Sequence, residues 1–127
     1  MMTKLLAYVT NHWIAHVPFY SVRHGWYRHV LGVHMGEGSS ILMGCFIYFY
    51  TPFFRAEHKL IMGPHCVVNR RCTLDGRGGI HMGRNVSVSP ETTLITSEHR
   101  VNDPDFGIED KPIVLEDYAW LGSRVVV

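Results

Sequence analysis

From residue 33 onward the sequence repeats a six-residue pattern, and this short period restricts the possible folds more than any other feature. Each unit opens with an aliphatic residue, glycine often follows it, and the fifth residue is small or moderate in size. Residues two apart in a strand share a face, so the fifth residue of one unit and the first residue of the next point the same way. The first positions are Met35, Ile41, Met62, Val68, Leu74, Met82, Val88, Leu94, Leu115, Leu121 and Val127, and the fifth positions are Ser39, Cys45, Cys66, Cys72, Gly78, Val86, Thr92, Ala119 and Val125.

Six residues suffice for one short strand and a corner, and three units would close a triangular turn of about 18 residues. The aliphatic residues would then stack inside from turn to turn at roughly 4.8 Å, the spacing of neighbouring strands. The fifth position would be small because the interior of such a prism is narrow, and glycine or asparagine at the corners would tolerate positive φ. The sequence therefore predicts an all-β solenoid over residues 33–127.

Residues 1–32 have a different period and predict a helical hairpin. One apolar stripe recurs at helical spacing, Pro18 ends the first helix, Ser21 is a candidate N-cap for the second, and Gly32 stands where a C-terminal glycine belongs. An aromatic amphipathic hairpin can also lie on a membrane surface, but we expect this one to pack on the repeats as a cap. The stripe consists of Leu5, Leu6, Val9, Trp13, Ile14 and Val17.

The repeats resemble those of the hexapeptide-repeat acyltransferases, in particular the sugar O-acetyltransferases of the galactoside, maltose and colanic-acid type. The resemblance covers residues 33–127 and implies a left-handed parallel β-helix, a handedness that no periodicity reveals. It also implies an acetyl-CoA-dependent transfer of an acetyl group to a hydroxyl of a sugar or a similar acceptor. With the helical cap of residues 1–32, we expect a single domain.

Two segments interrupt the repeat, and interruptions of a regular fold often carry function. The segment 48–60 is rich in aromatic residues and is interpreted as a bulge packing under the helices, with an acceptor-pocket wall as the alternative. The segment 96–112 predicts an extruded loop. It contains Thr96-Ser97-Glu98-His99, which is similar to the T/S-x-x-H motif of the family.

The resemblance implies that His99 is the general base. Histidine suits this role because it can take the proton of a poorly nucleophilic hydroxyl near neutral pH and pass it to the departing thiolate. The sequence leaves open whether one of the nearby carboxylates or a backbone carbonyl orients the ring. The candidate carboxylates are Glu98, Asp103, Asp105 and Glu109.

Five further residues are candidates by the same resemblance. Asn69 matches an asparagine that contacts the acceptor hydroxyl, although a corner asparagine in the left-handed region is an equal alternative for the residue alone. Asp75 is a weaker acceptor-binding candidate, because the glycines after it suggest a turn with an Asx hydrogen bond. Trp120-Leu121-Gly122-Ser123 resembles the family's W-I-G-S, which implies that Trp120, Gly122 and Ser123 contact acetyl-CoA.

Composition excludes several other classes of function. The formal charge of +1 provides no basic field for nucleic acid, and no apolar run approaches the ~18 residues of a membrane span. We therefore expect no nucleic-acid partner and no membrane insertion. Without a recognisable signal peptide, and with an odd number of cysteines, a cytoplasmic location is the default.

The nine histidines raise the alternative of zinc bound as in the γ-type carbonic anhydrases. The pair five apart on the repeats that such a site needs is missing, so we expect no metal, and we interpret Cys45, Cys66 and Cys72 as packed thiols without redox or ligand roles. The histidines concerned are His58, His65, His81 and His99.

Two expectations concern assembly and completeness. Apolar surface at Trp120 and in residues 48–54, together with the resemblance, predicts a homotrimer with active sites between subunits. Members of the family continue with further turns where this sequence stops at Val127, so it is interpreted as truncated. A catalytically weak β-helix with a structural or vestigial role is the alternative function, and acetyl-CoA binding by calorimetry separates the two.

Overall fold

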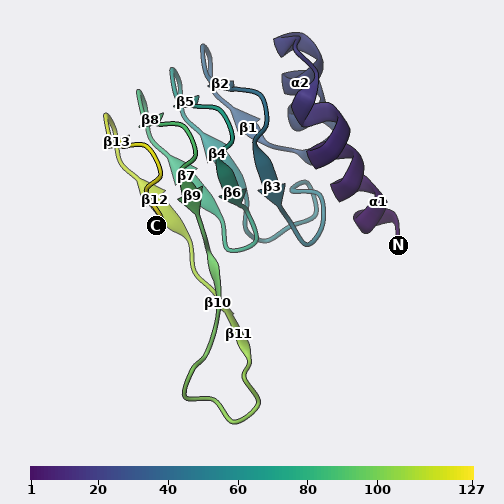
Figure 1. The fold of residues 1–127 in the computed structure, drawn as a ribbon, viewed down its shortest axis with the longest axis vertical. Helices are drawn as coiled ribbons and strands as arrows, with labels where there is room; N and C mark the ends of the chain where they lie inside the picture. Colours follow the sequence, from purple (N-terminus) through teal and green to yellow (C-terminus); the bar gives the residue numbers. More distant parts are fainter.

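The computed structural model describes residues 1–127, which form three parallel β-sheets preceded by a pair of short helices (Figure 1). The first sheet contains β1 (His34–Met35), β4 (Leu60–Met62), β7 (Ile80–Met82) and β12 (Ile113–Leu115). The second contains β2 (Ser40–Ile41), β5 (Val67–Val68), β8 (Ser87–Val88) and β13 (Trp120–Leu121), and the third contains β3 (Phe46–Tyr48), β6 (Thr73–Asp75) and β9 (Thr93–Leu94). A separate antiparallel hairpin, β10 (Ser97–His99) and β11 (Ile108–Asp110), interrupts this order.

Consecutive strands visit the three sheets in turn, so that each group of three strands lies beside the next group. The register confirms the six-residue alternation, because the first positions of units on neighbouring strands of one sheet are direct partners. Met35 pairs with Met62 and Met62 with Met82, and the equivalent residues of the other sheets do the same. Nine of the eleven first-position side chains, all except Leu121 and Val127, are among the 21 buried residues of one hydrophobic core, as predicted.

Corners of the fold with a positive φ lie at the fourth position of the units in the first and second sheets. They occur in pairs six residues apart, and only three of the eight are the expected glycine or asparagine. The glycines at the second position serve close packing instead, because a Cβ on Gly63 would clash with the carbonyl oxygen of Gly83 on the neighbouring strand. The corner residues are Gly38 and Gly44, His65 and Arg71, Asn85 and Glu91, and Tyr118 and Arg124.

The side chain at the fifth position of a unit is small, and in several units it is also a hydrogen-bond donor. Each of these hydroxyls or thiols donates to the carbonyl oxygen at the second position of a unit in the next turn, which satisfies a buried backbone acceptor. The pairs are Ser39 to Gly63 (2.6 Å), Cys45 to Asn69 (3.1 Å), Cys66 to Gly83 (2.9 Å), Cys72 to Ser89 (3.2 Å) and Thr92 to Gly122 (2.9 Å). The three cysteines are free and buried, as expected of packed thiols.

The N-terminal segment consists of α1 (Met2–Tyr8), η1 (Val9–Trp13, a π-helical turn), η2 (Ile14–His16, a 3₁₀ turn), α2 (Tyr20–Trp26) and η3 (Tyr27–Leu31, π-helical). The chain breaks around Pro18 as predicted, and Gly32 ends η3 with a φ of 82°. The predicted N-cap is wrong: Phe19 caps α2, and Ser21 lies inside the helix. None of these helices is long and apolar enough to cross a bilayer.

The side of the helices that meets the sheets combines apolar and polar residues, and only part of the predicted apolar stripe lies on it. Ala15, Tyr27 and Leu31 are buried there. The stripe residues that are half-buried are Leu6, Val9, Ile14 and Val17. Thr10, Asn11, Arg23 and His24 are buried, whereas Leu5 and Trp13 of the predicted stripe are 59% and 63% exposed. The physical reason is that the first strands of a stack present unpaired N–H and C=O groups, which only polar side chains can satisfy.

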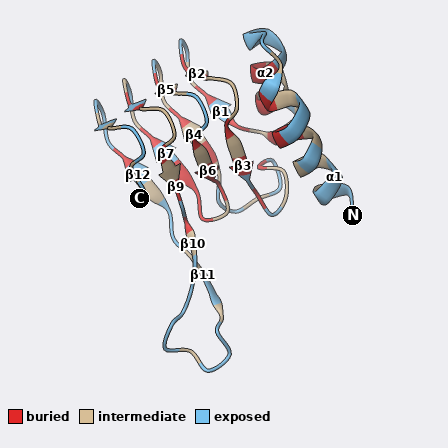
Figure 2. Cartoon of the chain, in the orientation of Figure 1, coloured by how far each residue is buried: buried red, intermediate tan, exposed pale blue.

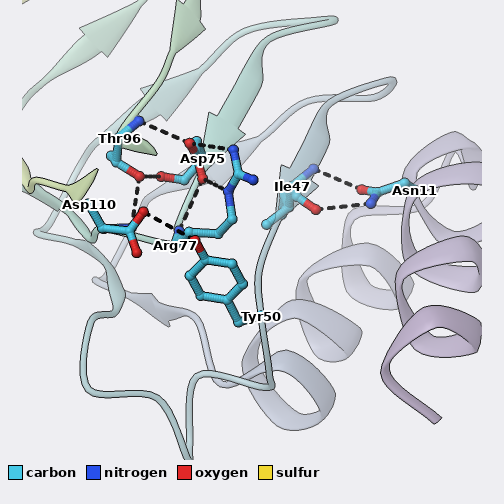
Figure 3. A network of polar contacts seen from close by, with 8 residues as sticks. Asn11, Ile47, Tyr50, Asp75, Arg77, Thr96 and Asp110 are labelled. Carbon is cyan, nitrogen blue, oxygen red and sulfur yellow. Dashed lines mark hydrogen bonds and ion pairs between the residues drawn. The ribbon is translucent and has the colours of Figure 1, made fainter. Parts of the chain in front are cut away.

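Asn11 acts in place of a neighbouring strand for β3. Its Nδ2 donates to the carbonyl oxygen of Ile47 at 2.9 Å, and its Oδ1 accepts from the N–H of the same residue at 2.8 Å (Figure 3).

Two consecutive residues of α2 do the same for Ile41 on β2. Nη2 of Arg23 donates to the carbonyl oxygen of Ile41 at 3.0 Å, and Nε2 of His24 accepts from its N–H at 3.1 Å. Burial, helped by the nearby Arg23 and Arg28, lowers the pKa of His24, which keeps the ring neutral and able to accept.

We predict that Asn11→Leu lowers the free energy of unfolding by about 2–4 kcal/mol, because it leaves both backbone groups of Ile47 buried without partners. Urea denaturation measures the change. Asn102→Leu, on the exposed hairpin, is the matched control and should change stability by no more than about 0.5 kcal/mol. Equal stabilities of the two variants would contradict this account of the cap.

Candidate functional site

The second interruption of the repeat forms a two-stranded hairpin that projects away from the sheets (Figure 1). Ser97 pairs with Asp110 at its base, Glu98 with Glu109, and His99 with Ile108. This pairing carries the chain outward from β9, the last strand of the third sheet, and places His99 on an exposed arm.

The ring of His99 is held by the returning half of the hairpin. Its Nδ1 lies 2.8 Å from the carbonyl oxygen of Phe106, and the two rings are stacked with centroids 4.2 Å apart and planes 15° apart. A carbonyl oxygen can only accept, so Nδ1 carries the proton and Nε2 of the neutral ring carries the lone pair. Of the orienting groups that the sequence left open, the structure selects a backbone carbonyl.

Asp103, one of the carboxylates considered for that role, instead shapes the hairpin tip. Its Oδ1 accepts from the N–H of Asp105 at 2.9 Å and its Oδ2 from the N–H of Gly107 at 3.1 Å. Phe106 adopts a φ of 51° between them, which turns its carbonyl towards His99. The tip therefore supports the residue that holds the histidine ring.

Asp75 anchors the base of the hairpin (Figure 3). Its carboxylate accepts from Nε and Nη2 of Arg77 at 2.8 and 3.0 Å and from the N–H of Thr96 at 3.0 Å. Oγ1 of Thr96 donates to the carbonyl oxygen of Asp75 at 2.9 Å and accepts from the N–H of Gly78 at 2.8 Å. Thr96, where the hairpin begins, is thus bound to Asp75 of the third sheet through both its backbone N–H and its side-chain hydroxyl.

The suspected Asx turn at Asp75 is confirmed, because Oδ1 also accepts from the N–H of Arg77 at 3.1 Å. The side chain is 0% exposed, and both oxygens are engaged within the chain, an arrangement that favours the structural interpretation over contact with an acceptor. Burial by itself would raise the pKa of Asp75, but the hydrogen bonds from Arg77 and Thr96 outweigh it and hold the pKa below its usual value.

Arg77, which the sequence analysis did not single out, joins the hairpin base to the aromatic segment 48–60. Its guanidinium lies 5.0 Å from the ring centroid of Tyr48 and 5.8 Å from that of Tyr50. The hydroxyl of Tyr50 donates to Oδ1 of Asp110 on β11 at 3.2 Å (Figure 3). The sequence did contain a signal for this ion pair: an aspartate at the end of a predicted strand, Asp75, is followed two residues later by an arginine.

A pocket of about 300 Å³ lies beside this cluster and is lined by Tyr50, Arg55, His58 and Arg77 among others. The same segment 48–60 packs under the helices, since Phe53 is buried and its N–H donates to the carbonyl oxygen of Leu31 at 2.6 Å. The segment is thus the bulge under the helices that the sequence predicted, and its other side lines this pocket.

Asn69 follows β5 and does not occupy the left-handed corner, which falls on Arg71. Its Oδ1 accepts from the N–H of Arg70 at 2.8 Å, and its carbonyl oxygen accepts from the thiol of Cys45. The conformational explanation for an asparagine at this position is therefore wrong. The side chain is half-buried at the surface of the second sheet.

Trp120, Gly122 and Ser123 lie in and just after β13, on the last strand of the second sheet. The Trp120 ring is 75% exposed, and its Nε1 donates to Oγ of Ser89 at 3.0 Å, which fixes the ring over the neighbouring turn. Gly122 is half-buried and Ser123 is exposed just after this strand.

One chain does not bring these candidates together around His99. The hollow beside the histidine is lined only by residues of the hairpin, from Glu98 to Asn102 and Glu109. No group of three or more histidine, cysteine, aspartate or glutamate side chains lies close enough together to hold a metal ion. Comparison with known proteins finds no matching family model, no matching curated protein and no matching solved structure.

We predict that Asp75→Asn lowers the free energy of unfolding by about 3 kcal/mol near neutral pH, because a partly buried arginine loses its charged partner. The depressed pKa of Asp75 means that its contribution is complete above about pH 4 and is lost as the pH falls through the folded-state pKa. The stability difference between wild type and variant should therefore shrink in acid.

Urea denaturation over a series of pH values measures this difference. Asp105→Asn, at the exposed hairpin tip, is the control and should follow wild type within about 0.5 kcal/mol. If the difference in unfolding free energy between wild type and Asp75→Asn stays constant down to the most acidic pH, the stabilisation does not come from the ionised carboxylate of Asp75.

Proposed function

We propose that the three sheets form a left-handed parallel β-helix of the hexapeptide-repeat type and that the chain is an acetyl-CoA-dependent O-acetyltransferase. The regular visiting of three sheets and the paired corners six residues apart support the β-helix. The handedness and the activity rest on the resemblance of the repeats and of the Thr96–His99 motif.

The observation that carries the activity is the orientation of His99. Its Nδ1 is committed to the Phe106 carbonyl, so Nε2 is the basic atom, and the ring stands on an exposed arm. A general base needs this combination of a fixed tautomer and an accessible lone pair. A histidine with a purely structural role would instead be expected to use both nitrogens within the fold.

In the proposed reaction, Nε2 of His99 removes the proton of an acceptor hydroxyl while the oxygen attacks the thioester carbonyl carbon of acetyl-CoA. The C–O bond forms, the tetrahedral intermediate collapses with cleavage of the C–S bond, and the imidazolium returns the proton to the thiolate of coenzyme A. The products are the acetylated acceptor and free coenzyme A. Phe106 and Asp103 would keep the ring aligned throughout.

The remaining candidates are proposed to act from a neighbouring subunit. The hairpin extends beyond its own sheets, and the hollow at His99 has no wall other than the hairpin itself. In a homotrimer, the body of the adjacent chain would supply Asn69 for the acceptor, and Trp120, Gly122 and Ser123 for the coenzyme. The exposed Trp120 ring supports this placement.

We predict that His99→Ala lowers the rate of acetyl transfer by roughly 10²–10⁴-fold, because the proton acceptor is removed. Release of free thiol from acetyl-CoA in the presence of hydroxylated acceptors measures the rate. Since the His99 side chain is exposed, the free energy of unfolding derived from thermal denaturation should change by less than about 1 kcal/mol. Asn69→Ala should lower the rate of acetyl transfer less than His99→Ala does.

His29→Ala, an exposed histidine on the helical segment, serves as the control and should retain full activity. A fully active His99→Ala protein would overturn the general base. Absence of acetyl-CoA binding by calorimetry in the wild type would overturn the enzymatic proposal and favour a structural role.

We also predict that the protein is a homotrimer at micromolar concentration. Light scattering coupled to size exclusion should return three times the 14.5 kDa chain mass. A single-chain mass would contradict the shared site, because one chain leaves His99 apart from the other candidates.

A further inference from the structure

The outer side of the N-terminal helices is apolar. Leu5, Tyr8, Trp13 and other large hydrophobic residues of this segment are exposed, while the inner side of the same helices is buried against the sheets (Figure 2). We call this surface the N-terminal apolar face; it consists of Met1, Met2, Leu5, Tyr8, Trp13, Phe19 and Val22.

The face follows from the way in which the helices cap the sheets. Because Asn11, Arg23 and His24 must point inward to satisfy β2 and β3, the residues on the opposite side of each helix point outward. Leu5 and Tyr8 lie three residues apart on α1, and Trp13 follows Tyr8 by five residues, about one turn of the π-helical η1, so they share that side. The rings of Tyr8 and Trp13 contact edge to face, with centroids 6.4 Å apart, which makes one continuous aromatic patch.

Charge is distributed very unevenly between this segment and the rest of the chain. All eleven acidic residues lie at Glu37 or later, so residues 1–36 contain none. The same segment contains three of the twelve basic side chains, Lys4, Arg23 and Arg28, and Lys4 is exposed beside the apolar face. With histidines neutral, residues 1–36 carry +3, and the remaining nine basic and eleven acidic residues leave residues 37–127 at −2.

We propose that the N-terminal apolar face binds the surface of a lipid bilayer that contains anionic lipids. Its aliphatic side chains would enter the boundary between headgroups and acyl chains, Trp13 and Tyr8 would lie at headgroup depth, and Lys4 would meet lipid phosphates, since Arg23 is buried against β2. The negative remainder of the chain would face away from the membrane. The helices lie on the bilayer in this arrangement, since none of them is able to cross it.

The charge distribution argues for lipid over a second copy of the chain. A symmetric contact would place the same patch against itself, and residues 1–36 offer no carboxylate to pair with Lys4 or Arg28. The inference also goes beyond the capping role expected from the sequence: the inner side caps the sheets, and the outer side is left for the membrane. It does not depend on the proposed acetyl transfer.

Co-sedimentation of the full chain with vesicles tests the proposal. We expect binding to vesicles of phosphatidylcholine mixed with phosphatidylglycerol, weaker binding to phosphatidylcholine alone, and weakening of the first by high salt. Trp13→Glu and Leu5→Glu should each lower the partition coefficient by roughly tenfold or more, because a charge then enters the interface.

Tyr118→Glu is the matched control, since it replaces a comparably exposed aromatic residue at the other end of the sheets, and its binding should equal wild type. Circular dichroism checks that all variants are folded, which their exposed positions favour. Equal binding of Trp13→Glu and wild type, equal loss in Tyr118→Glu, or no preference for anionic vesicles would each overturn the proposal. A change of molar mass on Trp13→Glu without lipid would overturn it too and assign the face to a protein contact.

Discussion

Each turn of this protein has to satisfy its backbone N–H and C=O groups on the turn beside it, and most features of the structure follow from that constraint. The parallel strands do so through their ladders, as between β1, β4 and β7. At the corners, where no ladder exists, the side chain at the fifth position donates to a carbonyl of the next turn, as Cys66 does to Gly83. The glycines at the second position allow the turns to approach closely enough for these bonds to form.

The same constraint explains the two places where the regular stack ends or is interrupted. At the first turn no earlier turn exists, and Asn11, Arg23 and His24 replace its backbone groups. At the hairpin, the chain leaves the third sheet after Thr96, and Asp75 with Arg77 holds that point in place. Beyond the anchor, the hairpin closes its own ladder and positions His99 through the carbonyl of Phe106.

The cap and the N-terminal apolar face are consequences of each other. A helix that turns Asn11 or Arg23 toward the unpaired strands leaves the apolar residues of its opposite side outside, as Leu5 and Trp13 show. This outward surface, which carries Lys4 and no acidic residue, is therefore built into the way the fold begins. The catalytic proposal concerns the hairpin, a separate element, so the two functions would be exercised by different parts of the chain.

The repeat could be predicted from the sequence because its signal is local and periodic: aliphatic residues six apart dictate one inward face whatever lies elsewhere. The break around Pro18, the terminal Gly32, the buried cysteines and the Asx turn at Asp75 are likewise determined by short stretches of chain. The break in the repeat also identified the segment that leaves it, whereas His99 became a candidate through the resemblance of Thr96–His99 to a family motif.

The tertiary structure alone decided which side of the helices is buried, because an amphipathic pattern does not reveal whether the partner surface is apolar or a row of unpaired backbone groups. It also decided that the carbonyl of Phe106, and not a carboxylate, orients His99, and that Arg77 and Thr96 donate hydrogen bonds to the carboxylate of Asp75. These contacts form between residues that a turn, the pairing of strands or a hairpin brings close together. The partner of a side chain depends on distances in space, so the sequence by itself determined only which side chains the chain contains.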